Sequence, residues 1–214
     1  MSICYIVGAG DFHDPHSELR PKECDLVLAA DGGYSHLKSH GVRCDLLIGD
    51  LDSLSDVPAD EKIQRHKVEK DETDMHLCYI EGARRGYTDF YIFGGVGARP
   101  DHTLANYALL YYMAKRGHRG FLFDEKTVAT VIADGRLSLS GERGATVSVF
   151  AVGGEARGVT LRGLKYTAEG ATLTPDFPLG VSNSLEDGEA VISVEDGALL
   201  VIAECPARNI LFPS

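Results

Sequence analysis

Short apolar runs alternate with amphipathic segments along the first 125 residues of the chain. The runs have the length of buried strands, and the segments between them have the three-to-four-residue spacing of helices. Strands separated by helices predict an α/β unit with a mainly parallel sheet. We expect its strands at residues 3–7, 25–30, 45–48, 89–93 and 120–123.

Two of the intervening segments have clear helix boundaries. The first is expected to run from Asp74 to Arg85, because Thr73 is a favourable N-cap and Gly86 interrupts the pattern. The second is expected at residues 103–116, just before Gly117. The apolar faces predicted for the two helices are Leu77, Ile80 and Ala83, and Leu104, Tyr107, Ala108 and Tyr111.

After residue 125 the helical period disappears, and short β-type runs separated by glycine-containing turns follow. Strands are expected at residues 127–132, 146–152, 159–161, 171–174, 190–194 and 198–202. Residues 195–197, Glu-Asp-Gly, are typical of a compact hairpin turn between the last two. The pattern predicts an α/β domain at residues 1–125 and a small antiparallel sandwich or barrel at residues 126–214.

Composition narrows the class of protein. The hydrophobic content of 44% suffices for a core, and the net charge of −11 argues against binding to nucleic-acid backbones. No apolar run has the length of a membrane span, and the five cysteines contain no C-x-x-C pair. We therefore expect a cytoplasmic protein that binds neither nucleic acid nor membrane and whose thiols are buried and structural.

Acidic residues gather where the expected parallel strands end. Asp31 follows the second strand, Asp50 and Asp52 follow the third, and Asp71 and Asp74 flank the start of a helix. Any one of these residues alone fits a turn or a helix cap. Together they predict a site for a hard cation such as Mg²⁺, because ligands bind beyond the carboxyl ends of parallel strands and clustered carboxylates repel one another without a cation.

A glycine-rich loop follows the expected strand at residues 89–93. Residues 94–102 read Gly-Gly-Val-Gly-Ala-Arg-Pro-Asp-His and lead into a helix. Backbone N–H groups, one arginine and a helix N-terminus are together suited to a polyphosphate. The P-loop pattern G-x-x-x-x-G-K-[ST] is absent from the sequence. His36 and His40 are spaced as one turn of a helix, and two solvated side chains are the simpler interpretation.

Five short motifs, in order, resemble those of the thiamine pyrophosphokinase (thiamin diphosphokinase) family. They are Ala30-Asp31-Gly32-Gly33, Gly49-Asp50-Leu51-Asp52-Ser53, Asp71-Glu72-Thr73-Asp74, the loop at residues 94–102, and Ser182-Asn183. The resemblance implies an α/β, Rossmann-like domain followed by a β-sandwich. It also implies transfer of diphosphate from ATP to thiamine with release of AMP, dependent on Mg²⁺, by a homodimer whose sites lie between subunits.

The resemblance also implies roles for individual residues. The expected magnesium ligands are Asp50, Asp52 and Asp71; the expected nucleotide-binding residues are Asp31, Gly32, Gly33, Asp50, Arg99 and His102; and the expected thiamine-binding residues are Thr73, Asp101, Ser182 and Asn183. The expected catalytic residues are Asp71, Asp74, Arg99 and Asp101. Arg99 would neutralise phosphate charge, whereas each of the three carboxylates is a candidate for accepting the hydroxyl proton.

Two positions depart from the family pattern. Ala98 stands where a second glycine usually precedes the arginine, and the chain has no tryptophan to stack on thiamine, a role that Phe177 is one candidate to fill. Two other functions fit some of these residues. A phosphohydrolase would use Asp50 as nucleophile and Asp52 as acid and base, and a Mg²⁺-nucleotide sensor would bind without catalysis.

Overall fold

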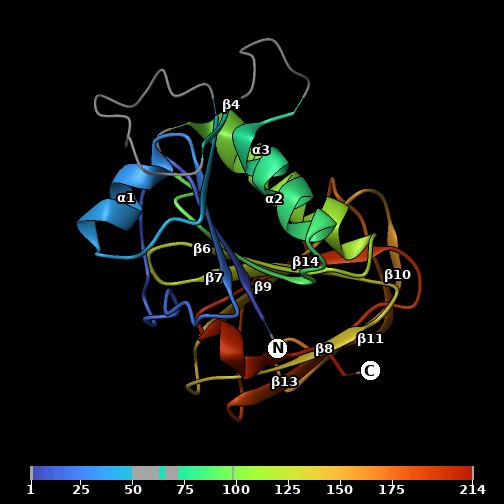
Figure 1. Cartoon of the computed structure of the whole chain (residues 1–214). Helices are drawn as coiled ribbons and strands as arrows, with labels where there is room; N and C mark the ends of the chain where they lie inside the picture. The colour runs from blue at the N-terminus through green and yellow to red at the C-terminus, as the bar shows by residue number, and fades with distance from the viewer. Residues whose placement is uncertain (1, 50–62, 66–71, 98, 214) are drawn as a thin grey trace. The chain divides into compact units, whose positions relative to one another are not determined.

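A computed structural model describes residues 2–49, 63–65, 72–97 and 99–213. The strands form a mixed sheet and a smaller antiparallel sheet, and helices are few (Figure 1). The chain divides into two compact units, Met1–Leu109 with Leu122–Glu125, and Leu110–Phe121 with Lys126–Ser214. None of the helices in the described residues is long and apolar enough to cross a bilayer.

The first unit contains five parallel strands. They are β1 (Cys4–Val7), β2 (Leu26–Ala30), β3 (Leu46–Gly49), β4 (Ile63–Arg65) and β5 (Asp89–Phe93). Their order is β5-β1-β2-β3-β4, and each neighbouring pair is parallel. β4 was not predicted. The other four strands and β6 (Arg119–Phe123) lie within one residue of their predicted bounds. Continuous burial of β1, β2, β3 and β5 explains their unbroken apolar runs.

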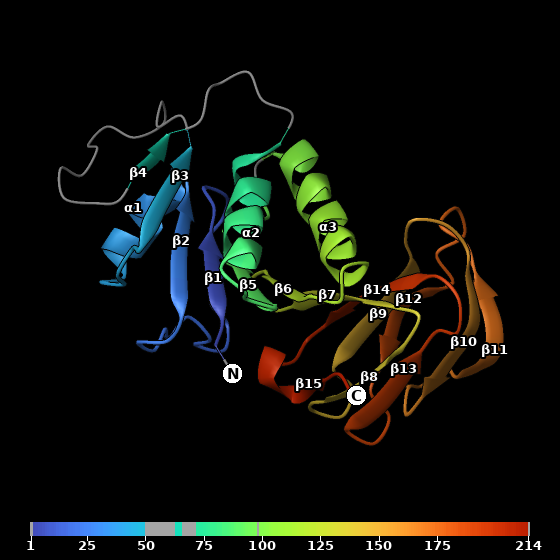
Figure 2. The same ribbon diagram turned by 45° about the vertical axis from the view of Figure 1, so that its right-hand side comes forward.

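Three helices are described: α1 (Gly33–Ser39), α2 (Asp74–Arg84) and α3 (Pro100–Ala114). α1 connects β2 to β3, whereas α2 connects β4 back to β5 on the other side of the sheet order. Right-handed crossovers running in opposite directions place their helices on opposite faces of a sheet. Figure 2 accordingly shows β1 and β2 between α1 and α2. Both helices contact these two strands.

The helix boundaries were predicted well, but the buried faces were not. Thr73 caps α2 as expected, because its Oγ1 accepts a hydrogen bond from His76 N at 3.2 Å. The predicted apolar face is wrong, since Ile80 is 41% exposed. The buried residues of α2 are Met75, Cys78, Tyr79, Glu81 and Gly82. A Cβ at Gly82 would lie 2.7 Å from Cys4 Sγ, so the helix approaches the sheet through this glycine.

In α3 the buried face also differs from the predicted one, and the helix starts earlier than predicted. It begins at Pro100, earlier than predicted, and proline is favoured in the first turn because that turn needs no N–H donor. Its predicted face is also wrong: Leu104 is 71% exposed and Ala108 is exposed. The side chains buried instead are Asn106, Leu109, Leu110 and Met113. Because the polar residue Asn106 begins this buried face, the spacing of apolar residues did not indicate which side of α3 is buried.

The second unit is antiparallel. Its strands are β7 (Val128–Ala133), β8 (Arg136–Ser140), β9 (Thr146–Ala151), β10 (Ala156–Arg162), β11 (Ala168–Leu173), β12 (Gly180–Ser184), β13 (Glu189–Ser193), β14 (Ala198–Ala203) and β15 (Ile210–Leu211), with a 3₁₀ turn at Ala207–Asn209. They pair in the orders β12-β9-β14-β7 and β11-β10-β13-β8-β15. The predicted hairpin at residues 195–197 is wrong, because β13 pairs with β8 and β10 while β14 pairs with β7 and β9.

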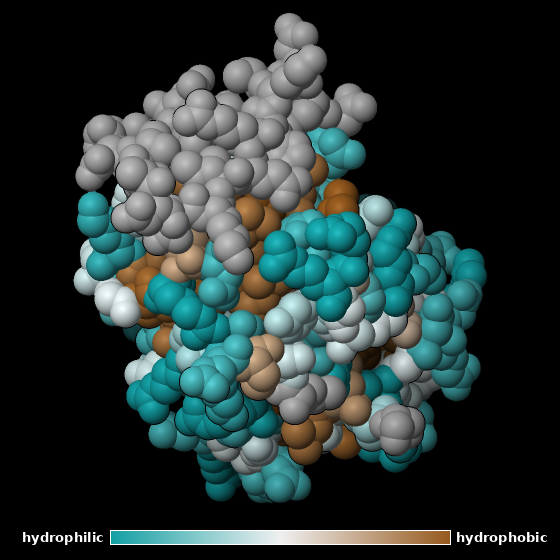
Figure 3. Space-filling model, in the orientation of Figure 1, coloured by the Kyte–Doolittle hydropathy of each residue, from teal (hydrophilic) through white to brown (hydrophobic). Residues whose placement is uncertain are grey.

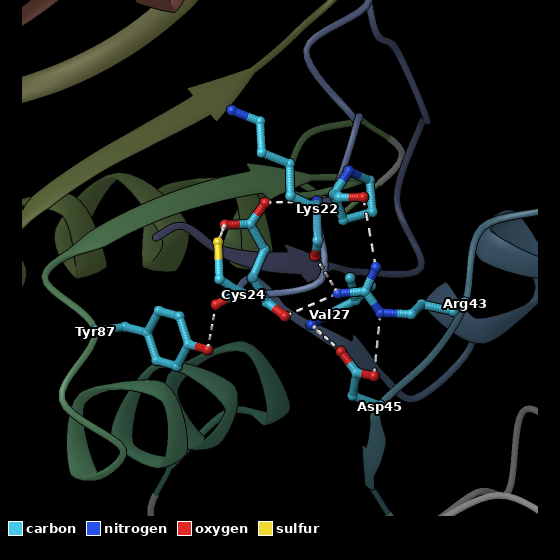
Figure 4. Close-up of polar contacts among 8 residues, drawn as sticks. Lys22, Cys24, Val27, Arg43, Asp45 and Tyr87 are labelled. Atoms are coloured by element: carbon cyan, nitrogen blue, oxygen red, sulfur yellow. Dashed lines mark hydrogen bonds and ion pairs between the residues drawn. The ribbon is translucent and has the colours of Figure 1, made fainter. Parts of the chain in front are cut away.

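The start of β2 is held by a polar network around Arg43 (Figure 4). The guanidinium donates to the carbonyl oxygens of Lys22 at 2.7 Å and Asp25 at 2.8 Å. It also pairs with Asp45 at 3.3 Å, and that carboxylate accepts from Val27 N at 2.8 Å. The network satisfies backbone groups at the amino end of the sheet, the end opposite to the predicted ligand site.

The surface is mainly hydrophilic, and the predicted burial of the cysteines is confirmed for some of them and wrong for others. Figure 3 shows a face on which hydrophilic residues dominate and hydrophobic side chains form smaller patches. The described residues contain no disulfide, and Cys4, Cys78 and Cys205 are buried as predicted, whereas Cys44 is half-buried. Cys24 is exposed, so the prediction of a buried thiol is wrong there.

Glu81 is a buried charge within α2. Its carboxylate accepts from Arg84 Nε at 2.9 Å and from Arg85 Nε at 2.7 Å, and the residue is 7% exposed. These hydrogen bonds, led by that from Arg84, hold the pKa of Glu81 below its usual value. The ionised form is therefore the one that stabilises the helix.

We expect Glu81→Gln to lower the free energy of unfolding at pH 7 by about 1.5–3 kcal/mol, the range for hydrogen bonds to charged groups. Because the folded pKa is lowered, the stabilisation is complete above the unfolded pKa of about 4.3 and is lost as the pH falls through the folded pKa. Urea unfolding of both proteins at pH 7 and in acid should show the difference shrinking.

The matched control is Glu169→Gln, which removes an exposed carboxylate 3.4 Å from Arg162. An exposed pair of this kind contributes about 0–1 kcal/mol, so this variant should be close to wild type. Equal losses in the two variants would contradict the importance of the buried carboxylate.

Candidate functional site

A cleft of about 240 Å³ lies in the first unit, beyond the carboxyl ends of β1, β2 and β5. Its lining residues are Ala9, Gly10, Asp31, Met75, Gly94, Gly95, Val96, Arg99, His102, Thr103 and Asn106. Three of these, Asp31, Arg99 and His102, are predicted nucleotide-binding residues. The cleft has the position expected for a ligand of a parallel sheet.

Two glycine loops, residues 8–11 and 94–97, form one wall of the cleft, and we call them the paired loops. Gly8 N donates to Phe93 O, and Gly10 N donates to Gly94 O, each at 2.8 Å. Gly94 has φ +60°, and a Cβ there would overlap the carbonyl oxygen of Gly8. The two backbones therefore touch where only glycine fits.

The N-terminus of α3 adds positive charge beside the paired loops. Arg99 precedes the helix, and Thr103 Oγ1 donates to its carbonyl oxygen at 3.2 Å. His102 and Thr103 line the cleft from the first turn. A helix N-terminus and a guanidinium facing one cleft favour an anionic ligand.

Arg99 is paired with Asp101 rather than isolated. Its Nη2 lies 2.7 Å from Asp101 Oδ2, and its Nε lies 3.3 Å from Oδ1. The hydrogen bond from Arg99 holds the pKa of Asp101 below its usual value, so this carboxylate is ionised at neutral pH. Asp101 does not line the cleft as the two side chains stand.

Asp31 lies at the end of β2 in the left-handed region, with φ +49°. Its N–H donates to Ile48 O at 2.9 Å, and its carboxylate lies against Gly49, where a Cβ would be 3.2 Å from Oδ1. Gly49 immediately precedes Asp50 in the sequence. Asp31 therefore faces the end of β3 as well as the cleft.

The predicted magnesium ligands Asp50, Asp52 and Asp71 lie outside the described residues. Within the part of the chain that the structure describes, no three histidine, cysteine or acidic side chains are grouped to hold a metal ion. The metal site stays a prediction.

Four other predicted residues have positions outside the cleft lining. Gly32 is the N-cap residue of α1, and Gly33 is buried where a Cβ would overlap the carbonyl oxygen of Val7. Thr73 caps α2, and Asp74 is the first residue of that helix. These observations explain their local structural roles, and their proposed contacts with ligands stay predictions. Met75, which was not predicted, lines the cleft from the same helix.

Asn106 is a second cleft residue that was not predicted. It is 4% exposed, and its Nδ2 donates to Gly95 O at 2.6 Å. It follows His102 by four residues, so the two lie on one face of α3. From the sequence alone, this four-residue spacing from His102 is the feature that could have indicated that Asn106 faces the cleft.

In the second unit, Ser182 and Asn183 lie on β12. Ser182 is exposed with φ +57°, and its N–H donates to Ser148 Oγ at 3.1 Å. Asn183 is 3% exposed, accepts from Tyr166 N at 2.9 Å and donates to Tyr166 O at 2.7 Å. The Asn183 amide thus holds the backbone of Tyr166, whose residue is 63% exposed.

Comparison with known proteins matches both parts of the chain to one family. Residues 18–122 match the family model "Thiamin pyrophosphokinase, catalytic domain", and residues 136–199 match "Thiamin pyrophosphokinase, vitamin B1 binding domain". The chain belongs to the thiamin pyrophosphokinase family. The resemblance of the five motifs to this family is thereby confirmed.

Relatives of this thiamin pyrophosphokinase family member span nearly its whole length. The chain is 26% identical over 187 residues to the thiamine pyrophosphokinase of Bacillus subtilis, covering 84% of this chain and 87% of that protein. The crystal structure of thiamin pyrophosphokinase from Geobacillus thermodenitrificans matches with a TM-score of 0.81 at 26% identity, over 97% of this chain and 99% of the other. The crystal structure of the Bacillus subtilis enzyme has the same fold, with a TM-score of 0.85 at 24% identity over 95% and 99% of the two chains.

The two thiamin pyrophosphokinase models divide the candidate residues between them. The catalytic-domain match contains the loop at residues 94–97, Arg99 and Asn106, and the vitamin B1 binding match contains Tyr166 and Asn183. The cleft of the first unit is therefore the candidate active site.

The contact between the paired loops leads to a test. We expect Gly94→Ala to abolish binding of an ATP analogue and to lower the free energy of unfolding by more than the cost of a positive φ, about 1 kcal/mol. The reason is that its Cβ would overlap the Gly8 carbonyl oxygen. Calorimetric titration and urea unfolding measure the two effects.

Gly117→Ala is the matched control. Gly117 also has a positive φ, +74°, but a Cβ there would have no atom within 4 Å. Its variant should lose only the cost of the dihedral angle and should bind the analogue normally. Equal behaviour of the two variants would show that the close contact is unimportant.

Proposed function

We propose that this chain transfers a diphosphate group from ATP to the hydroxyl of thiamine, giving thiamine diphosphate and AMP, with Mg²⁺ as cofactor. Family membership supports the reaction, and the observation that carries it is the cleft where the paired loops, Arg99 and the start of α3 meet. Residues 1–125 are proposed as a Rossmann-like catalytic domain, and residues 126–214 as a β-sandwich that binds thiamine and dimerises. The enzyme is proposed to act in the cytoplasm.

The first unit is proposed to bind ATP. Backbone N–H groups of the loop at residues 94–97, the positive end of α3 and the Arg99 guanidinium are all attractive to phosphate oxygens. Asp31, with Gly32 and Gly33 behind it, would lie beside the nucleotide. His102, which lines the cleft from the first turn of α3, would contact it from the other side.

Asp50, Asp52 and Asp71 are proposed to hold Mg²⁺. Carboxylate oxygens are the ligands that this hard cation prefers, so the residue types fit the ion. Asp31, a further carboxylate, lies against Gly49, next to the first of these residues in sequence. When bound, the ion would neutralise charge on the phosphate oxygens.

The reaction joins the thiamine hydroxyl oxygen to the β-phosphorus of ATP while the bond from that phosphorus to the oxygen of AMP breaks. Alignment and charge neutralisation are the main demands on the protein. The hydroxyl proton passes to a carboxylate, for which Asp71, Asp74 and Asp101 are candidates. Asp101 is a weak base while Arg99 donates to it, because that hydrogen bond lowers its pKa. It becomes a better one when Arg99 turns to phosphate.

The second unit is proposed to bind thiamine around β12, with Ser182 and the backbone held by Asn183. Tyr166 is proposed as the aromatic partner that the missing tryptophan would supply, because Asn183 fixes its backbone while its side chain stays accessible. Thr73 and Asp101 would contact thiamine from the catalytic domain.

A homodimer is proposed through the same region. Four of the large hydrophobic residues that are exposed in the described chain lie in or near β12: Tyr166, Phe177, Leu179 and Val181. β12 is also the first strand in the order of its sheet, where β9 is its partner among the described strands, and on its other side Lys165 N donates to Ser184 O at 2.9 Å. An edge strand flanked by exposed apolar side chains favours association with a second copy.

Incubation of the protein with thiamine, ATP and Mg²⁺ should yield AMP and thiamine diphosphate, and omission of thiamine should suppress AMP formation. Chromatography of the nucleotides measures this. ADP as the only nucleotide product would refute the proposal. Phosphate release without thiamine, through a trapped phosphoryl-enzyme, would favour a phosphohydrolase, and ATP binding without turnover would favour a sensor.

Within that assay, Asp71→Asn should lower turnover by about 100-fold or more, the order seen when one electrostatic group is removed from an active site. Its circular dichroism and unfolding curve should stay near wild type. Asp187→Asn, at an exposed position of the second unit, is the control and should keep full activity. Wild-type turnover of Asp71→Asn would exclude this residue from the site.

Tyr166→Ala should raise the KM for thiamine by about 10-fold, corresponding to about 1.4 kcal/mol of ring contact. Tyr166→Phe should keep the ring and stay near wild type, and the KM for ATP should be unchanged in both variants. Phe177→Ala is the comparison, since this ring is also exposed. A thiamine defect confined to Phe177→Ala would assign the contact to that residue instead.

A further inference from the structure

Side chains from two different helices hold carbonyl oxygens of the paired loops. In α1, His36 Nε2 lies 3.0 Å from Gly10 O. In α3, Asn106 Nδ2 lies 2.6 Å from Gly95 O. Gly10, Gly95 and Asn106 line the cleft, whereas His36 does not. Each helix thus donates one hydrogen bond to one loop.

The donors in these two contacts are determined by chemistry. A carbonyl oxygen only accepts hydrogen bonds, so His36 carries a proton on Nε2 and Asn106 presents its NH₂ group. The His36 ring also stacks on Phe12, with centroids 5.2 Å apart, and the Phe12 ring stacks on Phe93 at 5.9 Å. The imidazole is therefore oriented by ring packing as well as by its hydrogen bond.

The orientation of glycine peptides matters where phosphate binds. Without a Cβ, a peptide next to glycine can rotate at little cost, and rotation exchanges its N–H for its carbonyl oxygen. An N–H attracts a phosphate oxygen, whereas a carbonyl oxygen repels it. A glycine loop binds polyphosphate well only if its carbonyl oxygens are occupied by other donors.

We propose that His36 and Asn106 are positioning residues for the polyphosphate of ATP. By donating to the carbonyl oxygens of Gly10 and Gly95, they fix the loop at residues 94–97 before the nucleotide arrives. Asn106 holds the Gly95 carbonyl directly. His36 holds the carbonyl of the peptide whose N–H, that of Asp11, donates to Val96 O at 2.8 Å. The inference rests on the proposed function of the cleft. It gives His36, at first interpreted as a solvated side chain, a part in nucleotide binding that involves no contact with the nucleotide.

The decisive variant is His36→Phe, which keeps an aromatic ring against Phe12 and removes the donor to Gly10. Its matched control is His40→Phe. The His40 ring also contacts the Phe12 ring, in a tilted arrangement with centroids 4.4 Å apart. In the described chain its ring nitrogen bonds to His36 O and Ser39 Oγ and not to the paired loops. His36→Gln restores a donor and serves as the conservative variant.

For the second loop the variant is Asn106→Asp, which preserves shape, removes the amide donor and places carboxylate oxygen against the Gly95 carbonyl. Circular dichroism and urea unfolding establish whether it folds. If it does not, the pair of histidine variants carries the test alone.

Binding of α,β-methylene ATP with Mg²⁺, and separately of thiamine, is measured by calorimetry, and KM and kcat are measured in the AMP assay. We expect His36→Phe and folded Asn106→Asp to weaken analogue binding and raise the KM for ATP by about 5- to 50-fold, at most the loss of one hydrogen bond from a loop N–H to phosphate. Thiamine binding should be unchanged. His40→Phe should behave as wild type, and His36→Gln should recover part of the loss.

Three outcomes would overturn the inference. One is normal analogue binding by His36→Phe, and another is an equal loss for His40→Phe. The third is a parallel loss of thiamine binding, which would indicate a general structural defect. These results differ from failure of the proposed function, which would appear in the wild-type protein as absent analogue binding and absent AMP formation.

Discussion

The contact between the paired loops is the constraint on which the candidate site depends. The carbonyl oxygen of Gly8 occupies the space that a Cβ of Gly94 would need, so the ends of β1 and β5 continue side by side beyond the sheet. Because the loops touch, the chain after Gly97 starts α3 at the rim of the cleft. Arg99, just before α3, and His102 and Asn106 within it therefore reach one ligand-sized space.

Local patterns predicted the strands better than the helix faces, and the reason is physical. A strand of a parallel sheet is buried on both sides, so its apolar run is continuous and its bounds are visible. A helix shows only one buried face, and in α2 and α3 that face includes Gly82, Glu81 and Asn106. Gly82 is buried because it lacks a side chain, and the other two because their polar groups are paired. No count of apolar residues finds such a face.

The connection after β13 was mispredicted for a different reason. A short Glu-Asp-Gly segment is compatible with a hairpin and equally with a crossing between sheets. Here Arg157 N donates to Asp196 O at 2.8 Å, and β13 and β14 continue into different sheets. The motif also marks Asn183, whose amide holds the backbone of Tyr166, and its contact with a ligand stays a prediction. Motifs identify residues that matter but not the atoms to which they bind.

The Arg99 guanidinium is already paired with the Asp101 carboxylate, so a ligand that binds Arg99 must displace this carboxylate. A carboxylate two residues away acts as a permanent competitor, present at high effective concentration because it belongs to the same chain. A small anion that contacts only Arg99 must displace the Asp101 carboxylate by that one contact. A polyphosphate displaces it while also binding the glycine loops and the helix N-terminus. Since both partners are largely exposed, the pair is weak enough to open. A ligand with several phosphate groups would therefore displace Asp101 from Arg99 more effectively than an anion that makes one contact.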